Sequence, residues 1–325
     1  MDRSVRVSQS VRRWLTGPQS DPSVRVRYWT EVEGRPVEDA RVRAQQRAIG
    51  RVGWAATLLE RQWPDGHWMT PGTTAEELYF PKFVATNWIA IVLAELGMTR
   101  ADARIREVAQ LILDRFGGHG EGLHGSSGDV CWTGIAVRMM IRFGYLDHPA
   151  VQQSIDWIVR TQKADGGWHH VPARTGTLDA WEGLAALAEI PEAQRDEGVR
   201  RSIEQGAEFF LQRRLMNEGR APYPPWFRIH FPNHYYYDIL VGLKILTRIG
   251  YGSDPRMLPA VNWLRQKRAR DGTWALDALV PDRDARFTDY TSGRIVFPIM
   301  LEPVHEPSRW ATVDALSVLN RVAAT

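Results

Sequence analysis

Three stretches of the chain share one frame, and this repeated frame decides the fold. They are Gln62-Trp63-Pro64-Asp65-Gly66-His67-Trp68, Gln162-Lys163-Ala164-Asp165-Gly166-Gly167-Trp168, and Gln266 to Arg270 continued by Asp271-Gly272-Thr273-Trp274. Each contains a Gln, then Asp-Gly, one further residue and a Trp. The Asp residues lie 100 and 106 positions apart. Such regular spacing indicates a repeat protein.

Weaker copies of the frame lie halfway between the strong ones, at Phe116 to Gly120 and Leu215 to Gly219. The period is therefore about 50 residues, which is the size of a hairpin of two helices. In each box the Gly supplies a positive φ, the Asp bonds nearby backbone donors, and the Trp packs against the neighbouring hairpin. We therefore expect the boxes to be structural and not catalytic.

The segments on either side of each box differ in apolar pattern. Those before the boxes are amphipathic, which predicts outer helices over residues 54–62, 108–116, 155–162, 203–215 and 258–266. Those after the boxes are apolar on nearly all sides, which predicts buried inner helices over residues 86–96, 130–143, 178–190, 235–249 and 311–322.

The two ends of the repeat array complete the expected architecture. Residues 8–15 and 24–33 predict a sixth outer and inner pair, residues 37–49 an additional helix, and residues 275–306 a long insertion that could cover the mouth as a lid. The sequence therefore predicts an all-α fold, an (α/α)6 toroid of helical hairpins. It forms one domain over residues 1–325, and residues 1–50 complete the ring.

Composition excludes several classes of protein. The 325 residues are 44% hydrophobic and 24% charged with a net charge of +3, which is typical of a globular protein. The longest apolar run, Trp88 to Ala94, is too short to span a membrane, and residues 1–17 lack a signal-peptide core. The single Cys cannot form an internal disulfide, and the Arg residues form no dense block for nucleic acid. We expect a cytoplasmic protein with no nucleic-acid partner.

The boxes and the helices that flank them resemble the prenyltransferase and squalene-oxidase repeat superfamily. The resemblance covers residues 50 to 323. The superfamily includes squalene-hopene and oxidosqualene cyclases, the β subunits of protein prenyltransferases, and single-domain bacterial members. The resemblance implies an (α/α)6 barrel whose central cavity faces the beginnings of the inner helices. Function must be argued from those positions, because a fold hosts many activities.

Aromatic side chains occur at the beginning of every expected inner helix. Aromatic walls bind apolar polyenes and stabilise cations through the ring quadrupole. The residues predicted to bind substrate are Trp88, Trp132, Trp181, Tyr235, Tyr237 and Trp310. Ordinary packing between inner helices is the alternative explanation for each of them.

The segment Asp129-Val130-Cys131-Trp132-Thr133 suggests acid chemistry. Class II cyclases, which the chain resembles, begin their reaction with Asp-x-Asp-Asp-Thr at such a position. Here Cys131 and Trp132 replace the two central carboxylates, and a thiol is too weak an acid to protonate an alkene. The candidates for proton donation or relay are Asp129, His234, Asp238 and Asp314, and Asp179 and Glu302 are further carboxyl groups that burial could keep protonated.

The same segment also suggests a metal site. Protein prenyltransferase β subunits bind zinc through Asp-x-Cys-Tyr and a His that opens a later inner helix. Asp129, Cys131 and His234 match those positions and would make an open zinc site. No cofactor is expected otherwise, and zinc is expected only if the chain is a prenyltransferase. The neighbouring His169 and His170 are expected on the surface.

The first hypothesis is an isoprenoid-handling enzyme, most like a small class II terpene cyclase, which is an isomerase. Its partner would be a small apolar substrate, a polyene or a prenyl diphosphate. The alternatives are a zinc-dependent prenyltransferase, a carbohydrate-active α/α barrel, and a non-catalytic isoprenoid-binding protein.

Overall fold

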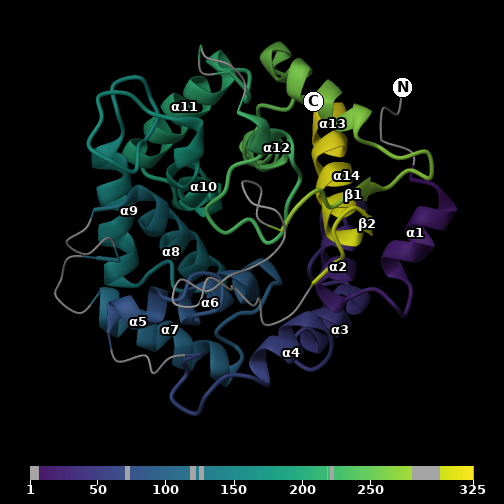
Figure 1. Cartoon of the computed structure of the whole chain (residues 1–325), viewed down its shortest axis with the longest axis horizontal. Coiled ribbons are helices and arrows are strands. Elements are labelled where there is room, and N and C mark those ends of the chain that lie inside the picture. Colours follow the sequence, from purple (N-terminus) through teal and green to yellow (C-terminus); the bar gives the residue numbers. More distant parts are fainter. Residues whose placement is uncertain are drawn as a thin grey trace. The chain divides into compact units, whose positions relative to one another are not determined.

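The computed structural model describes residues 7–69, 74–117, 122–123, 128–217, 219, 223–279 and 301–324, whose regular structure is mostly helical (Figure 1). In this part of the chain the strands are β1 (Trp274–Ala275) and β2 (Pro307–Ser308), which pair antiparallel. The all-α prediction is confirmed. The chain forms two compact units: one spans Met1–Gly53, Ala207–Ala285 and Leu301–Thr325, and the other spans Trp54–Gly206 and Arg286–Met300. Most of the predicted insertion, residues 280–300, lies outside the described residues.

The second unit alternates amphipathic and buried helices, as the apolar pattern predicts. Each of α6, α8 and α10 is buried along most of its length, whereas α7 and α9 bury one face. In chain order its helices are α4 (Trp54–Leu59), α5 (Ala75–Tyr79), α6 (Thr86–Glu95), α7 (Ala103–Phe116), α8 (Val130–Phe143), α9 (Pro149–Thr161), the 3-10 helix η2 (Leu178–Ala180), α10 (Glu182–Glu189), the 3-10 helix η3 (Glu192–Gln194) and the first part of α11 (Glu197–Gln212).

The first unit is built from the two ends of the chain and the segment after α11. The expected helix at residues 37–49 is α3, and the buried helix near the C-terminus is α14. In chain order its helices are α1 (Gln9–Thr16), α2 (Pro22–Arg27), the π-helix η1 (Tyr28–Val32), α3 (Ala40–Ala48), the 3-10 helix η4 (Pro224–Phe227), α12 (Ile239–Arg248), the 3-10 helix η5 (Pro255–Met257), α13 (Leu258–Gln266) and α14 (Arg309–Ala324).

The three boxes have the same internal hydrogen bonds. In each, the Trp donates its indole N–H to the carbonyl ten residues earlier, and the Gly has a positive φ. The indole bonds join Trp68 to Leu58, Trp168 to Ile158 and Trp274 to Leu264, at 2.9, 2.9 and 2.8 Å. The φ values of Gly66, Gly166 and Gly272 are 89°, 86° and 94°. The boxes are therefore turns that fasten the end of one helix, and their predicted structural role is confirmed.

Two of the boxes also tie one hairpin to the next through their Gln. The side-chain N–H of Gln162 bonds the carbonyls of Gly166, at 2.7 Å, and of Ser202 in α11, at 2.9 Å. Gln62 bonds Gly66 and Arg104 of α7 in the same way, both at 3.1 Å. One side chain therefore closes its own turn and holds the following outer helix.

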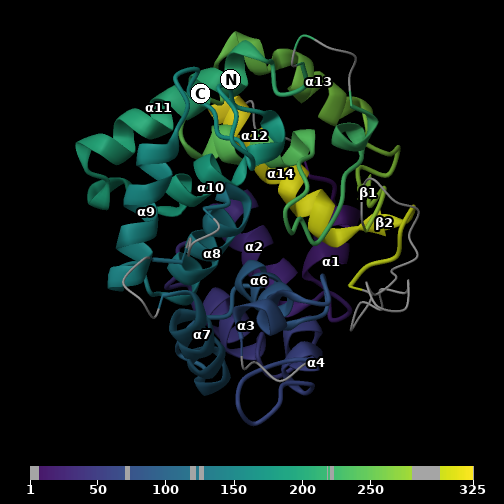
Figure 2. The ribbon, with the colours of Figure 1, turned by 60° about the vertical axis from the view of Figure 1, so that its left-hand side comes forward.

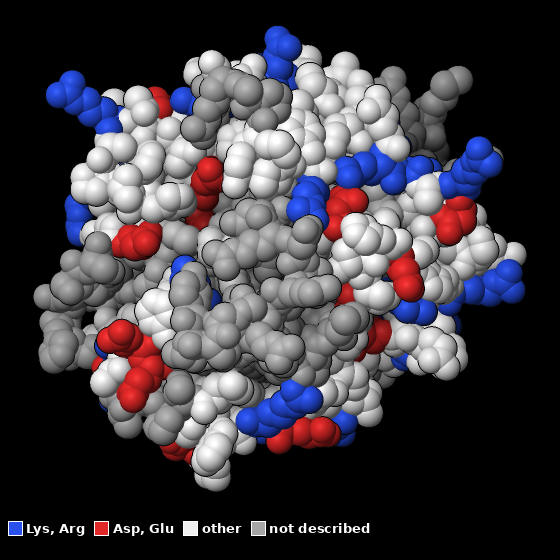
Figure 3. All heavy atoms as spheres, viewed as in Figure 1, with Lys and Arg blue, Asp and Glu red and all other residues white. Residues whose placement is uncertain are grey.

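Charge on the described surface is mixed. On the face shown in Figure 3, basic and acidic side chains are interspersed and form no single-sign block among the residues drawn in colour. None of the described helices combines the length and the apolar composition needed to cross a bilayer.

Replacing Gln162 by Ala tests the role of the box. The substitution removes the two bonds to backbone carbonyls and the bond that Ser202 Oγ donates to Gln162 Oε1 at 2.8 Å. We expect the free energy of unfolding in urea to fall by about 2 kcal/mol. Gln110→Ala, at an exposed position of α7 bonded to Asp114, is the control and should change it by less than about 0.5 kcal/mol. Equal effects of the two substitutions would contradict a structural role for the box.

Candidate functional site at the beginnings of three buried helices

The buried helices α6, α8 and α10 run parallel, because their C-terminal ends meet in one ion network. Arg142 of α8 lies 2.8 Å from Glu95 of α6 and 2.6 Å from Glu189 of α10. Arg138 contacts the same two carboxylates. Both glutamates are the last residues of their helices. The two arginines and two glutamates balance in charge, which makes their burial tolerable. The beginnings of the three helices therefore lie at the other end of the unit.

The beginnings of α8 and α10 approach each other at backbone distance. A Cβ atom on Gly134 would lie 2.5 Å from the backbone carbonyl of Glu182, so only glycine allows this approach. The two helices lie side by side in both ribbon views (Figures 1 and 2). This close packing places the Cys131 thiol against the Glu182 carboxyl group.

Asp129, a predicted catalytic residue, caps the beginning of α8. Its Oδ1 accepts the backbone N–H of Cys131 at 2.9 Å, and its carbonyl accepts the hydroxyl of Thr133 at 2.7 Å. A ligand-capable atom of Asp129, of Cys131 and of His170 all lie within 4.8 Å of one another. His170 is half-buried at this cluster, whereas the sequence had suggested a surface position.

Glu182 is the buried acid of the site. It begins α10 and is 1% exposed. Apart from its own backbone N–H and the Cys131 thiol, no described residue bonds its carboxyl oxygens. Burial raises the pKa of Glu182 well above its usual range, and the charges of Asp129 and Asp179 raise it further. This environment favours the neutral form of the carboxyl group.

The same surroundings shift the pKa of the Cys131 thiol. Burial raises its pKa well above the usual value, and the negative charges of Glu182 and Asp129 act in the same direction. Lys82 opposes this effect only weakly. Among the described residues that act most strongly on Cys131 and Glu182, the negatively charged ones therefore outnumber the positively charged one, Lys82.

Aromatic rings surround the beginnings of α6 and α8. The Tyr79 ring centroid lies 4.9 Å from that of Trp88 and 6.0 Å from that of Trp132. Phe116 contacts Trp132 at 4.8 Å, and Phe83 contacts Trp88 at 5.1 Å. The structure thus brings two predicted substrate-binding residues, Trp88 and Trp132, into one aromatic cluster.

The third predicted aromatic of this unit, Trp181, is 1% exposed and directly precedes α10. Its ring centroid lies 5.5 Å from the Arg138 guanidinium. Trp181 is therefore linked to the ion network of the helix ends as well as to Glu182, its neighbour in the sequence.

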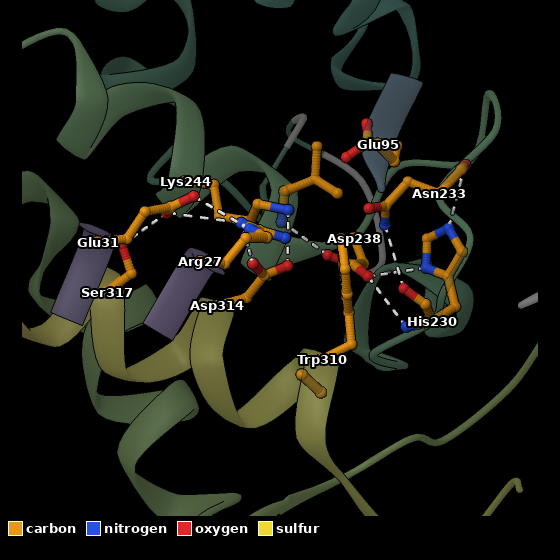
Figure 4. Close-up of polar contacts among 12 residues, drawn as sticks. Arg27, Glu31, Glu95, His230, Asn233, Asp238, Lys244, Trp310, Asp314 and Ser317 are labelled. Carbon is orange, nitrogen blue, oxygen red and sulfur yellow. Dashed lines mark hydrogen bonds and ion pairs between the residues drawn. The ribbon is translucent and has the colours of Figure 1, made fainter. Parts of the chain in front are cut away.

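The other candidate acids belong to the first unit and have partners there (Figure 4). Asp314 contacts Arg27 at 2.5 Å and Lys244 at 2.6 Å, so both of its oxygens are engaged by cations. Asp238 caps α12 through the Val241 N–H at 2.7 Å and lies 2.7 Å from the imidazole of His230. These carboxylates hold helices together.

Glu302 also serves as a cap. It accepts the backbone N–H groups of Arg309 and Trp310 at 2.7 and 3.2 Å, together with the hydroxyl of Ser308. Burial raises its pKa, and these hydrogen bonds act in the opposite direction.

The remaining predicted residues of the first unit are mostly packed. Trp310 stacks on Phe231 with centroids 4.3 Å apart, beneath the Arg27 guanidinium at 4.4 Å. Tyr237 donates its hydroxyl to the Leu215 carbonyl at 2.8 Å. Tyr235 is half-buried, and its hydroxyl lies 3.2 Å from that of Tyr236.

His234 is buried and has a left-handed backbone with φ of 39°. It belongs to a different unit from Asp129 and Cys131. The predicted zinc set that includes His234 therefore stays a prediction.

Sequence reasoning missed Glu182 and His170 as members of the cluster. Glu182 carried a usable signal, because a glutamate inside a segment expected to be buried on most sides is rare unless it is paired or functional. His170 carried none, since a loop residue has no periodicity that places it.

Comparisons with known proteins give structural neighbours only. No family model matches the chain, and no curated protein matches it. A crystal structure of a protein from Actinoplanes is 16% identical, covers 83% of this chain and 97% of its own, and has a TM-score of 0.35. Two structures of type II terpene cyclase MstE from Scytonema are each 14% identical to this chain. One has no ligand, and the other is a variant in complex with geranylgeranyl dihydroxybenzoate. Both MstE structures cover 83% of this chain, and 95% and 94% of their own, with TM-scores of 0.29. The function of this chain is therefore inferred from its own residues.

Replacing Gly134 by Ala tests the close approach of α8 and α10. The new methyl group would meet backbone atoms of Glu182, which cannot rotate away, so we expect a loss of about 3 kcal/mol in the free energy of unfolding. Gly198→Ala in the first turn of α11 is the control, because its nearest atom would be 3.3 Å away, on a side chain. It should be neutral or slightly stabilising. A neutral Gly134→Ala would show that the two helices can separate.

Proposed function

We propose that this protein is an isoprenoid-handling enzyme of the class II terpene cyclase type, which starts its reaction by protonating an alkene. The observation that carries the proposal is the placement of Glu182. Its carboxyl group is buried at the beginning of an apolar helix, bonded by no described residue other than its own backbone N–H and Cys131, and adjacent to Trp181 in sequence.

Protonating an alkene requires a neutral carboxyl group in a dry site. Glu182 meets this requirement better than the acids predicted from sequence, because Asp129 accepts a backbone N–H, and Asp238 and Asp314 contact basic side chains. In the proposed step the Glu182 O–H bond breaks, the proton adds to one alkene carbon, and the other carbon becomes a carbocation. Loss of a proton from the cyclised cation at the end makes the overall reaction an isomerisation.

A carbocation needs stabilisation that does not trap it. The faces of Trp88 and Trp132, grouped around Tyr79, offer π-electron density without a nucleophilic lone pair pointing at the cation. Burial of these rings also excludes water, which would otherwise quench the cation early.

Glu182→Gln tests the proposal. The amide has nearly the same shape but cannot donate the proton, so we expect product formation to fall at least about a thousandfold while substrate binding persists. The measurement is gas chromatography with mass spectrometry after incubation with squalene, geranylgeraniol or geranylgeranyl diphosphate. Glu302→Gln, a change at a buried carboxyl group that caps α14, is the matched control and should lower stability more than turnover. Full activity in Glu182→Gln would rule out this acid.

A non-catalytic isoprenoid-binding protein gives a different result in the same assay. In that case the wild-type protein would bind a polyene and return it unchanged. A carbohydrate-active barrel would bind none of the three isoprenoids.

A zinc-dependent prenyltransferase is the second candidate, because Asp129, Cys131 and His170 lie within mutual reach of one ion. One thiolate, one imidazole and one carboxylate form a recognised open zinc set, and bound zinc would activate a thiol acceptor. This set differs from the one predicted from the sequence, which contained His234 and not His170.

Metal analysis separates the two candidates. A prenyltransferase would purify with one zinc ion per chain and lose both zinc and activity in Cys131→Ala and His170→Ala. The cyclase proposal expects substoichiometric zinc and retained cyclisation in Cys131→Ala. Stoichiometric zinc that disappears with activity in both variants would favour the second candidate over the first.

A further inference from the structure

Two more polar groups are buried without a described partner at the beginnings of the same helices. Asn87, the second residue of α6, is fully buried, and neither its amide nitrogen nor its amide oxygen has a partner among the described residues. The indole nitrogen of Trp132, in the first turn of α8, is likewise without one there. Glu182 of α10, whose carboxyl group is bonded only by its own backbone N–H and the Cys131 thiol among the described residues, is the comparable group of the third helix.

This arrangement is unusual for a protein interior. More than nine in ten buried polar groups are hydrogen-bonded, because an unsatisfied one costs stability. The C-terminal ends of the same helices are fully paired through Arg138 and Arg142. Within these three helices the unpaired groups lie at the end where Trp88 and Trp132 share the aromatic cluster, which points to a ligand that brings its own polar group.

The donor and acceptor types narrow the identity of that group. The Asn87 amide offers two N–H donors and one acceptor, and the Trp132 indole offers one donor. A hydroxyl group complements them, because its oxygen accepts two hydrogen bonds and its proton is donated to the amide oxygen. A hydrocarbon chain would leave all of these groups unsatisfied.

Charge excludes the other common isoprenoid head group. The charges of Asp129 and Asp179 act on the Glu182 carboxyl group at this end of the helices, and Lys82 acts on the Cys131 thiol. A diphosphate carries two to three negative charges and would be repelled by the two aspartates. A neutral alcohol or phenol meets no such penalty.

We propose that the substrate of this site is an isoprenoid with a neutral hydroxyl group, which Asn87 and Trp132 bind, and is neither a prenyl diphosphate nor a pure hydrocarbon. This inference rests on the proposed isoprenoid function and specifies its substrate class. The hydroxyl group anchors one end of the chain and leaves the alkene for the acid.

Equilibrium binding of three probes of the same chain length tests the inference. Binding is monitored through the tryptophan fluorescence of the protein. The probes are geranylgeraniol, the corresponding C20 hydrocarbon without oxygen, and geranylgeranyl diphosphate. We expect the wild-type protein to bind the alcohol at least about tenfold more tightly than either other probe, since one well-placed hydrogen bond is worth about 1.4 kcal/mol.

Asn87→Leu should abolish this preference by weakening alcohol binding about tenfold and leaving hydrocarbon binding unchanged. Its melting temperature should equal or exceed that of the wild type, because the lost amide has no bond in the described chain. Trp132→Phe, which retains the aromatic ring, should weaken alcohol binding in the same direction. Asn233→Leu is the matched control: its amide bonds the His230 carbonyl at 3.1 Å, so this change should lower stability without altering the preference.

Two results would overturn the inference without touching the proposed function. One is equal binding of the alcohol and the hydrocarbon by the wild-type protein. The other is a marked loss of stability in Asn87→Leu together with an unchanged preference in Trp132→Phe, which would show that these groups are bonded within the protein. Failure of all three probes to bind would instead reject the isoprenoid function itself.

Discussion

The ion network of Glu95, Glu189, Arg138 and Arg142 is the constraint on which the candidate site depends. It ties the C-terminal ends of α6, α8 and α10 together with two positive and two negative charges in balance. A buried charge without its partner is costly, so the network fixes which helices are neighbours and how they are aligned. It thereby collects the beginnings of these helices at the opposite end of the unit.

The two ends of the three helices contrast in chemistry. At one end the arginines and glutamates are paired, whereas at the other the Glu182 carboxyl group contacts the Cys131 thiol, and the Asn87 amide has no partner among the described residues. Burial favours the neutral forms of acids, so the same packing that shapes the site also raises the pKa of Glu182 and of Cys131. In this unit, chemical reactivity follows from how the helices are packed more than from any single motif.

The segment at residues 129–133, which resembles the acid motif of cyclases, forms the capped beginning of α8 in the structure. The Asp129 carboxylate accepts the backbone N–H of Cys131, and the Cys131 thiol contacts the Glu182 carboxyl group. In our proposal the acid is therefore Glu182 of α10 and not Asp129. The close approach of the two helices at Gly134 brings Glu182 against the beginning of α8. Such a shift is invisible to a search for a continuous motif, since the two residues are about fifty positions apart in the chain.

The sequence by itself determined the helical class, the box turns and the buried character of α6, α8 and α10. These features are local: an Asp-Gly turn needs a positive φ, and a helix that is apolar all round must be buried. It also placed Trp88 and Trp132 correctly at helix beginnings. Only the tertiary structure decided that Asp238 and Asp314 contact basic side chains, that His170 joins Asp129, and that Asn87 and Glu182 lack ordinary partners. Whether a buried polar group has a partner depends on residues far away in the chain, and no local pattern encodes those contacts.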